Sequence, residues 1–113
     1  MKRKFSSGDI IWVDLDPVQG HEQQGLRPAL IVWGNKALNY MPGLAQVCAI
    51  TNTDNDFAFH FSLAGHCDDT TGFVCCEQTR VIDLNARNAK YKDKVSREFL
   101  DMIQQALIAM YEE

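Results

Sequence analysis

One short polar stretch lies between two apolar segments of the sequence: Gln19-Gly20-His21-Glu22-Gln23-Gln24-Gly25, which leads into Leu26-Arg27-Pro28. An imidazole such as that of His21 can transfer a proton near neutral pH, and the guanidinium of Arg27 can hold phosphate oxygens through two parallel hydrogen bonds. Two glycines let the backbone turn sharply and approach a ligand. Since loops on a rigid scaffold often carry catalytic groups, this stretch could cut a substrate, bind one, or only connect two strands.

The chain has 113 residues, 46% of them hydrophobic, which is enough to build the core of one compact domain over residues 1–113. The formal charge of −4 and the pI near 5.3 argue against a protein coated in positive potential. Six of the eleven basic residues nevertheless lie in one segment: Arg80, Arg87, Lys90, Lys92, Lys94 and Arg97. The basic N-terminus precedes no long apolar run, and no segment approaches membrane-spanning length, so we expect a cytoplasmic protein without membrane contacts.

The four cysteines, Cys48, Cys67, Cys75 and Cys76, contain no C-x-x-C pair. On a strand, the adjacent Cys75 and Cys76 would point to opposite faces. A zinc site of His66, Cys67 and Cys75 can be imagined, but the spacing rules for such sites disfavour it. We therefore expect reduced, partly buried thiols, with no metal and no other cofactor.

Runs rich in β-branched or aromatic residues, bounded by Gly, Pro, Asn or Asp, predict strands at residues 9–15, 28–33, 45–51, 57–63 and 73–78. A further strand at 89–95 alternates Lys90, Lys92 and Lys94 with Tyr91 and Val95, which would gather basic side chains into a stripe. An ordinary solvated edge strand explains the same lysines equally well. A short helical turn is expected around 35–40.

The last segment predicts a helix. Ser96 is a suitable N-cap, and Glu98 lies in the first turn, where the helix dipole favours negative charge. Apolar residues then follow helical spacing: Phe99, Met102, Ile103, Ala106, Leu107 and Met110. Leu100 and Ile108 widen this face and hint at a partner surface, although packing in the core is the better explanation for most of these residues. Many short strands followed by one helix predict a mainly β (α+β) fold, in which a small antiparallel barrel-like sheet packs against the C-terminal helix.

Several segments occur in order along nearly the whole chain: Gly8-Asp9-Ile10-Ile11-Trp12-Val13-Asp14-Leu15-Asp16-Pro17, Gly20-His21-Glu22-Gln23-Gln24-Gly25-Leu26-Arg27-Pro28-Ala29, Ala49-Ile50-Thr51-Asn52, Thr70-Thr71-Gly72-Phe73-Val74, and Glu77-Gln78-Thr79-Arg80-Val81-Ile82-Asp83 with Ala86-Arg87. Together they resemble the MazF/PemK (Kid) family of toxin–antitoxin messenger-RNA interferases, most closely its PemK/Kid branch. The string at 20–28 is the most specific of these motifs.

This resemblance implies a CcdB/MazF-like fold, which is an SH3-like antiparallel barrel or twisted sheet with a C-terminal helix, and a homodimer. It also implies an endoribonuclease toxin that binds single-stranded messenger RNA in a groove and cuts it at a short sequence without metal. Attack by the 2′-OH would leave a 2′,3′-cyclic phosphate and a 5′-hydroxyl, and would inhibit translation and growth. The implied partner is an antitoxin whose acidic C-terminal tail occupies the same groove, and operator DNA would be contacted only through that antitoxin.

Residue by residue, the resemblance implies a catalytic arginine at Arg27 and a threonine beside the scissile phosphate at Thr51. His21 matches a supporting loop histidine. Glu77 matches an aspartate proposed as general base, and Glu22 follows the family's loop glutamate; we rank Glu77 before Glu22 as the base. The loop that carries His21 and Glu22 is expected to be a mobile flap that delivers Arg27 to the RNA groove.

Candidate RNA contacts by motif position are Asn52, Phe59, Thr71, Gln78 and Arg80, although an aromatic residue such as Phe59 on an alternating strand is as readily core. One position departs from the branch: its proposed general acid, an arginine two residues before the base, is replaced here by Cys75. A neutral thiol is a poor substitute for it. Either Arg27 and Thr51 then carry the reaction, or the nuclease activity is weakened or lost.

Two other functions stay open. The thiol of Cys75 and the acidic pI are compatible with a non-cleaving module of the same architecture that binds RNA or a protein. A gyrase-poisoning toxin of the CcdB type would share the fold, and Met110-Tyr111-Glu112-Glu113 offers a faint version of its aromatic C-terminal signature. The polar loop at 20–28 argues against that second alternative.

Overall fold

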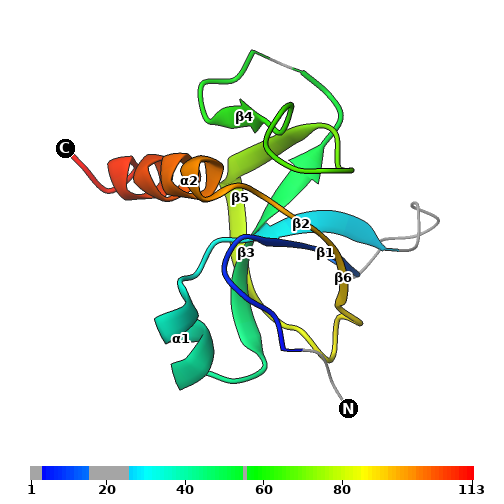
Figure 1. The fold of residues 1–113 in the computed structure, drawn as a ribbon. Coiled ribbons are helices and arrows are strands. Elements are labelled where there is room, and N and C mark those ends of the chain that lie inside the picture. Colours follow the sequence, from blue (N-terminus) through cyan, green and yellow to red (C-terminus); the bar gives the residue numbers. More distant parts are fainter. Residues whose placement is uncertain (1–3, 16–25, 55) are drawn as a thin grey trace, which may run out of the picture.

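The computed structural model describes residues 4–15, 26–54 and 56–113 (Figure 1). In these residues, strands form one curled sheet in the order β4-β5-β3-β2-β1-β6, and every neighbouring pair is antiparallel. The strands are β1 Asp9–Val13, β2 Arg27–Ile31, β3 Leu44–Thr51, β4 His60–Ser62, β5 Phe73–Asp83 and β6 Lys90–Lys94, and the helices are α1 Asn35–Tyr40 and α2 Arg97–Ala109. The predicted mainly β, antiparallel fold with a C-terminal helix is confirmed, as is the short helix at 35–40.

The sheet buries apolar side chains on both faces. Ile10 belongs to a core cluster that includes Phe99 of α2, whereas its neighbour Ile11 belongs to a second cluster that includes Leu38 of α1. Successive residues of a strand point to opposite faces, so one strand supplies both cores. Figure 1 shows the two helices beside the curled sheet, each at a different part of it.

Helix α2 begins as the sequence predicts. The hydroxyl of Ser96 accepts a hydrogen bond from the backbone N–H of Phe99 at 3.1 Å, which satisfies one of the N–H groups left free at a helix start. The helix buries Phe99, Leu100, Ile103 and Ala106. Met102 and Met110 are exposed, which their helical spacing did not predict. Leu100 belongs to the core, and Ile108 is exposed. Neither helix of the described chain is long and apolar enough to cross a bilayer.

Two strand boundaries differ from the predicted ones. β4 is shorter than 57–63, because Phe57 begins a turn in which its carbonyl accepts a hydrogen bond from the N–H of His60 at 3.0 Å. β5 is longer than 73–78, because it passes through a bulge and then resumes. Cys75 pairs with Ala49, and the next paired residue, Thr79, faces Cys48, so residues 76–78 bulge out of the β3–β5 ladder.

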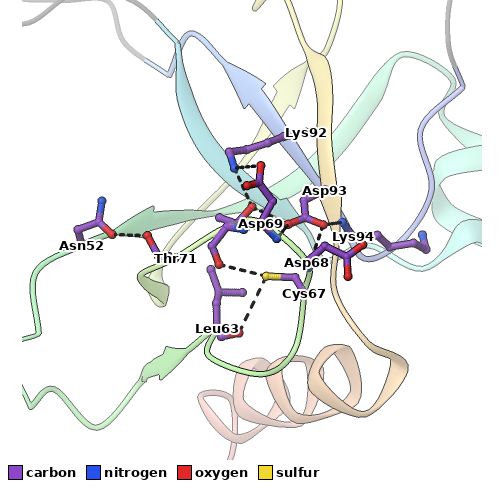
Figure 2. A network of polar contacts seen from close by, with 10 residues as sticks. Asn52, Leu63, Cys67, Asp68, Asp69, Thr71, Lys92, Asp93 and Lys94 are labelled. Carbon is purple, nitrogen blue, oxygen red and sulfur yellow. Dashed lines mark hydrogen bonds and ion pairs between the residues drawn. The ribbon is translucent and has the colours of Figure 1, made fainter.

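The carboxylate of Asp93 on β6 holds the loop between β4 and β5 against the sheet (Figure 2). It accepts hydrogen bonds from the N–H of Asp69 at 2.8 Å, from the N–H of Thr70 at 2.9 Å and from the Thr70 hydroxyl at 3.0 Å, and the N–H of Lys94 adds a fourth at 2.8 Å. Burial raises the pKa of Asp93, but these donors outweigh it and hold the pKa at about 2.

The lysines of β6 do not form a free basic stripe. The ammonium of Lys92 donates to the hydroxyl of Thr70 at 2.9 Å and lies 3.5 Å from a carboxylate oxygen of Asp69, and Lys94 pairs with Asp9 at 2.9 Å. β6 forms one edge of the sheet. The edge-strand alternative is therefore correct, because acidic partners neutralise two of the three lysines.

We expect Asp93→Asn to lower the free energy of unfolding by about 2 kcal/mol at neutral pH, because an amide cannot accept all of these hydrogen bonds. The ordinary carboxyl pKa of 3.8 lies above the folded value of about 2, so this stabilisation is complete above about pH 5 and is lost as the pH falls toward 2. Urea unfolding of both proteins at pH 7 and at about pH 3 checks this: the difference between them should shrink at the lower pH. An equal difference at both pH values would contradict it.

Candidate active site

Three neighbouring strands enclose a groove of about 470 Å³. β2 contributes its first residue, β3 contributes its last residues, and β5 contributes the end of its bulge and the two residues that follow. Four residues that the sequence singles out line this groove: Arg27, Thr51, Gln78 and Arg80. The structure thus brings together side chains from three separate parts of the chain.

The register between β2 and β3 explains why Arg27 and Thr51 meet. Ala29 pairs with Ala49, and Ile31 pairs with Val47. Extending this antiparallel register by two residues sets Arg27 opposite Thr51, on the same face of the sheet as Ala29 and Ala49. Both residues line the same groove, so the guanidinium and the hydroxyl can act on one ligand. Arg27 is part of β2, so the sheet itself helps to position it.

Thr51 sits in a tightly fitted strand end. Its hydroxyl oxygen accepts a hydrogen bond from the N–H of Thr53 at 3.2 Å, which leaves the hydroxyl proton available for donation. Gly72 crosses beside it with φ of +110°, and a Cβ atom there would lie 2.5 Å from the carbonyl oxygen of Thr51. Only glycine fits this close approach without displacing Thr51.

The bulge in β5 directs Glu77 toward β4. A carboxylate oxygen of Glu77 lies 2.8 Å from Nε2 of His60, and the side-chain amide of Gln78 approaches the same oxygen at 3.4 Å. Burial raises the pKa of Glu77, but the hydrogen bond from His60 and smaller electrostatic effects outweigh it, so the pKa is lowered and Glu77 is ionised at neutral pH. The groove lining includes Gln78 and not Glu77, so this carboxylate lies at its margin.

His60 is the residue that the sequence analysis missed. We had no reason to connect it with Glu77, because the turn at residue 57 and the register of β4 cannot be read from the sequence. A weaker signal was present: in the run Phe59-His60-Phe61-Ser62, polar and aromatic residues alternate, which predicts that His60 points away from the aromatic face. The ring of Phe57 covers it at 5.0 Å between ring centres.

The other predicted RNA contacts lie outside the groove lining. The hydroxyl of Thr71 donates to the side-chain oxygen of Asn52 at 3.2 Å, and both residues are exposed (Figure 2). Phe59 is half-buried against the core, in agreement with the core alternative. Within the groove, a guanidinium nitrogen of Arg80 donates to the carbonyl of Leu15.

The remaining predictions concern the polar loop at 16–25 and the cysteines. His21 and Glu22, with the rest of the 16–25 loop and its expected role as a flap, lie outside the described residues. All four cysteines are free, as expected. The imagined zinc trio does not form within the described part of the chain: Cys67 instead donates to the carbonyl of Thr70 at 3.2 Å. Potential metal ligands do come together elsewhere, at His60, Cys75 and Glu77.

The groove can bind and polarise an anion. The guanidinium groups of Arg27 and Arg80 offer positive charge and N–H donors that match phosphate oxygens, and the hydroxyl of Thr51 offers a neutral donor. An ionised carboxylate, that of Glu77, lies at the edge. These groups can bind a phosphodiester, stabilise additional charge on its phosphorus, and accept a proton nearby.

Comparison with known sequences points to one family. The family described as "PemK-like, MazF-like toxin of type II toxin-antitoxin system" matches residues 6–111. The endoribonuclease PemK of Escherichia coli is 41% identical over 106 residues, covering 90% of this chain and 78% of the relative. The endoribonuclease toxin ChpB of Escherichia coli K12 is 39% identical over 114 residues, covering 96% and 93%.

Comparison with solved structures agrees. MazF (Form-I) from Deinococcus radiodurans superimposes with a TM-score of 0.82 at 27% identity, covering 99% of this chain and all of that one. The MazE-MazF structure (Form-II) from the same organism gives a TM-score of 0.83 at 28% identity, with 96% of each chain covered.

We expect His60→Ala to raise the pKa of Glu77, because the hydrogen bond from His60 is the largest of the effects that lower it. An NMR titration of the Glu77 side-chain carboxyl measures this directly. Gln78→Ala is the matched control and should change the pKa less, because its contact is longer at 3.4 Å. An unchanged or lowered pKa in His60→Ala would contradict the expectation.

Proposed function

The chain belongs to the family of PemK-like, MazF-like toxins of type II toxin–antitoxin systems, and on this premise we propose that it is an endoribonuclease toxin that cuts single-stranded messenger RNA. One observation carries the assignment to a site: Arg27 and Thr51 line the same groove. Residues 1–113 form a single toxin domain in this proposal. Cleavage needs no metal, because the groove supplies its own positive charge.

Cleavage begins with the 2′-oxygen of the ribose, which attacks the neighbouring phosphorus while a base removes its proton. The bond from phosphorus to the 5′-oxygen then breaks, which leaves a 2′,3′-cyclic phosphate and a 5′-hydroxyl. Arg27 binds two phosphate oxygens and stabilises the extra charge of the phosphorane. Thr51 donates its hydroxyl proton to a phosphate oxygen or orients the 2′-OH.

Glu77 is the proposed base, ahead of Glu22. Its lowered pKa keeps the carboxylate able to accept a proton at neutral pH, and the hydrogen bond from His60 holds it in place. His21 is our candidate for returning a proton to the leaving 5′-oxygen, since an imidazole titrates near neutral pH. Burial, with the nearby charge of Glu77, raises the pKa of Cys75 to about 11, so this thiol stays neutral and supplies no positive charge. Arg27 therefore stabilises the phosphorane without help from position 75.

Substrate selection would use the exposed polar residues around the groove. Gln78 and Arg80 lie within it, and Asn52 and Thr71 lie beyond the end of β3 next to Thr51. Single-stranded RNA is read by hydrogen bonds to unstacked bases, which these amide, guanidinium and hydroxyl groups can make.

The proposed partners follow from the same groove. An antitoxin with an acidic C-terminal tail would pair its carboxylates with Arg27 and Arg80 and so exclude RNA; a MazE-MazF assembly is the subject of one similar solved structure. We propose that the toxin acts as a cytoplasmic homodimer and contacts operator DNA only through the antitoxin.

We expect the purified protein to cut a long mixed-sequence RNA at one short motif in the presence of EDTA. Arg27→Ala should slow the cleavage by about 100-fold or more and Thr51→Ala by about 10-fold or more, because each removes a donor to the phosphorane. Mapping the cut ends by sequencing, with a test for the cyclic phosphate, measures both the motif and the chemistry.

Arg97→Ala is the matched control. Arg97 is an exposed arginine on α2, paired with Asp101 at 3.3 Å, and its loss should leave the rate unchanged. A folded protein that binds RNA without cutting it would overturn the nuclease and favour the binding module. Cleavage that is equally fast in Arg27→Ala would refute the assigned role of Arg27.

A further inference from the structure

The ladder between β4 and β5 places three potential metal ligands on one face. His60 pairs directly with Cys75, and Glu77 lies two residues farther along β5. Their ligand atoms, an imidazole nitrogen, a thiol sulfur and a carboxylate oxygen, all lie within 4.8 Å of one another. We propose that His60, Cys75 and Glu77 form a binding site for one divalent cation of the zinc class.

The donor set fits zinc better than a hard cation. Zinc takes imidazole, thiolate and carboxylate ligands, whereas magnesium and calcium take oxygen ligands almost alone. Three protein ligands leave a fourth tetrahedral position for water or another small ligand. Binding requires the thiolate of Cys75, whose proton passes to solvent, and the lone pair of the His60 nitrogen, whose proton moves to the other ring nitrogen.

The distances require only small movements. Ligand atoms around a tetrahedral zinc ion lie about 3.3–3.6 Å apart, given bonds of about 2.0 Å to nitrogen or oxygen and about 2.3 Å to sulfur. The contact between His60 and Glu77 is now 2.8 Å and must open slightly, while the other separations, at most 4.8 Å, must close by at most about 1.3 Å. Rotation of the partly exposed Glu77 side chain can adjust its own two separations, and small rotamer changes of His60 and Cys75 can close the distance between the imidazole and the thiol.

Two of the three ligands are buried, and the third is partly exposed to solvent. The side chain of His60 is 7% exposed and Cys75 is 1% exposed, whereas the side chain of Glu77 is 33% exposed and provides access from solvent. Nδ1 of His60 is buried without a hydrogen-bond partner among the described residues. Among the described residues, Glu77 is therefore the only hydrogen-bond partner of the His60 ring. A cation that binds both Nε2 and the Glu77 carboxylate replaces this one contact.

An occupied site has a consequence that rests on the proposed function. A carboxylate that coordinates zinc cannot accept the proton of the ribose 2′-OH, so bound zinc would inhibit cleavage. The binding itself does not depend on that activity, since it concerns the three side chains only.

Titration of the reduced protein with Co²⁺ tests the site without RNA. We expect one equivalent of cobalt to give a cobalt–thiolate charge-transfer band with the visible bands of a tetrahedral ion, and one equivalent of Zn²⁺ to remove them. Cys75→Ala and Cys75→Ser should abolish the charge-transfer band, and Glu77→Gln, at the most exposed of the three positions, should weaken zinc binding about tenfold or more.

Cys67→Ser is the matched control, because Cys67 is a half-buried thiol bonded to the carbonyl of Thr70, and it should keep the band. If the wild type shows no charge-transfer band at saturating cobalt, the proposed site is wrong. The proposal is also wrong if the charge-transfer band persists in folded Cys75→Ala or Cys75→Ser. A protein that binds cobalt as expected but never cuts RNA would refute the proposed function and leave the site standing.

Discussion

The antiparallel pairing of β2 with β3 is the constraint on which the candidate site depends. The ladder pairs Ala29 with Ala49, and the same register continued by two residues brings Arg27, the first residue of β2, to Thr51, the last residue of β3. A slip of one residue would turn one of these side chains to the opposite face of the sheet. The register is held by burial, because Ala29, Ile31 and Val47 belong to the core cluster on the α1 side. The groove thus lies at the end of a buried sheet face, and its polar residues Arg27 and Thr51 follow directly after the apolar residues of that face.

The bulge in β5 directs neighbouring polar residues to different places. Gln78 and Arg80 enter the groove beside Arg27, whereas Glu77 lies at the margin and bonds to His60. The same geometry brings the thiol of Cys75 near that pair. One irregularity of the backbone therefore places a carboxylate where it can serve the groove and also where it can ligate a cation. The buried carboxylate of Asp93, at the far edge of the sheet, fixes the loop that leads into this strand.

The sequence predicted the class of fold, the terminal helix with its Ser96 cap, and the two residues that the groove brings together, because alternation, capping and a long run of family motifs are local signals. Sequence patterns could not predict the features that depend on tertiary contacts. Lys92 and Lys94 fitted a basic stripe and a solvated edge strand equally well, and only the loop acids and Asp9 beside them decide between the two. The contact between His60 and Glu77 could not be predicted, because it depends on a bulge and a turn that are not visible in the sequence. Nothing in the pattern of residues 73–78 distinguished a strand end from a bulge.

A double-mutant cycle on Arg27 and Thr51 tests the central claim most directly. Single-turnover cleavage rates of the wild type, Arg27→Ala, Thr51→Ala and the double variant give the coupling free energy between the two side chains. If both act on one phosphate, the second substitution should cost less than it does alone, with a coupling of at least about 1 kcal/mol. Rate losses that multiply fully, with no coupling, would show that the two residues act independently and would contradict the account.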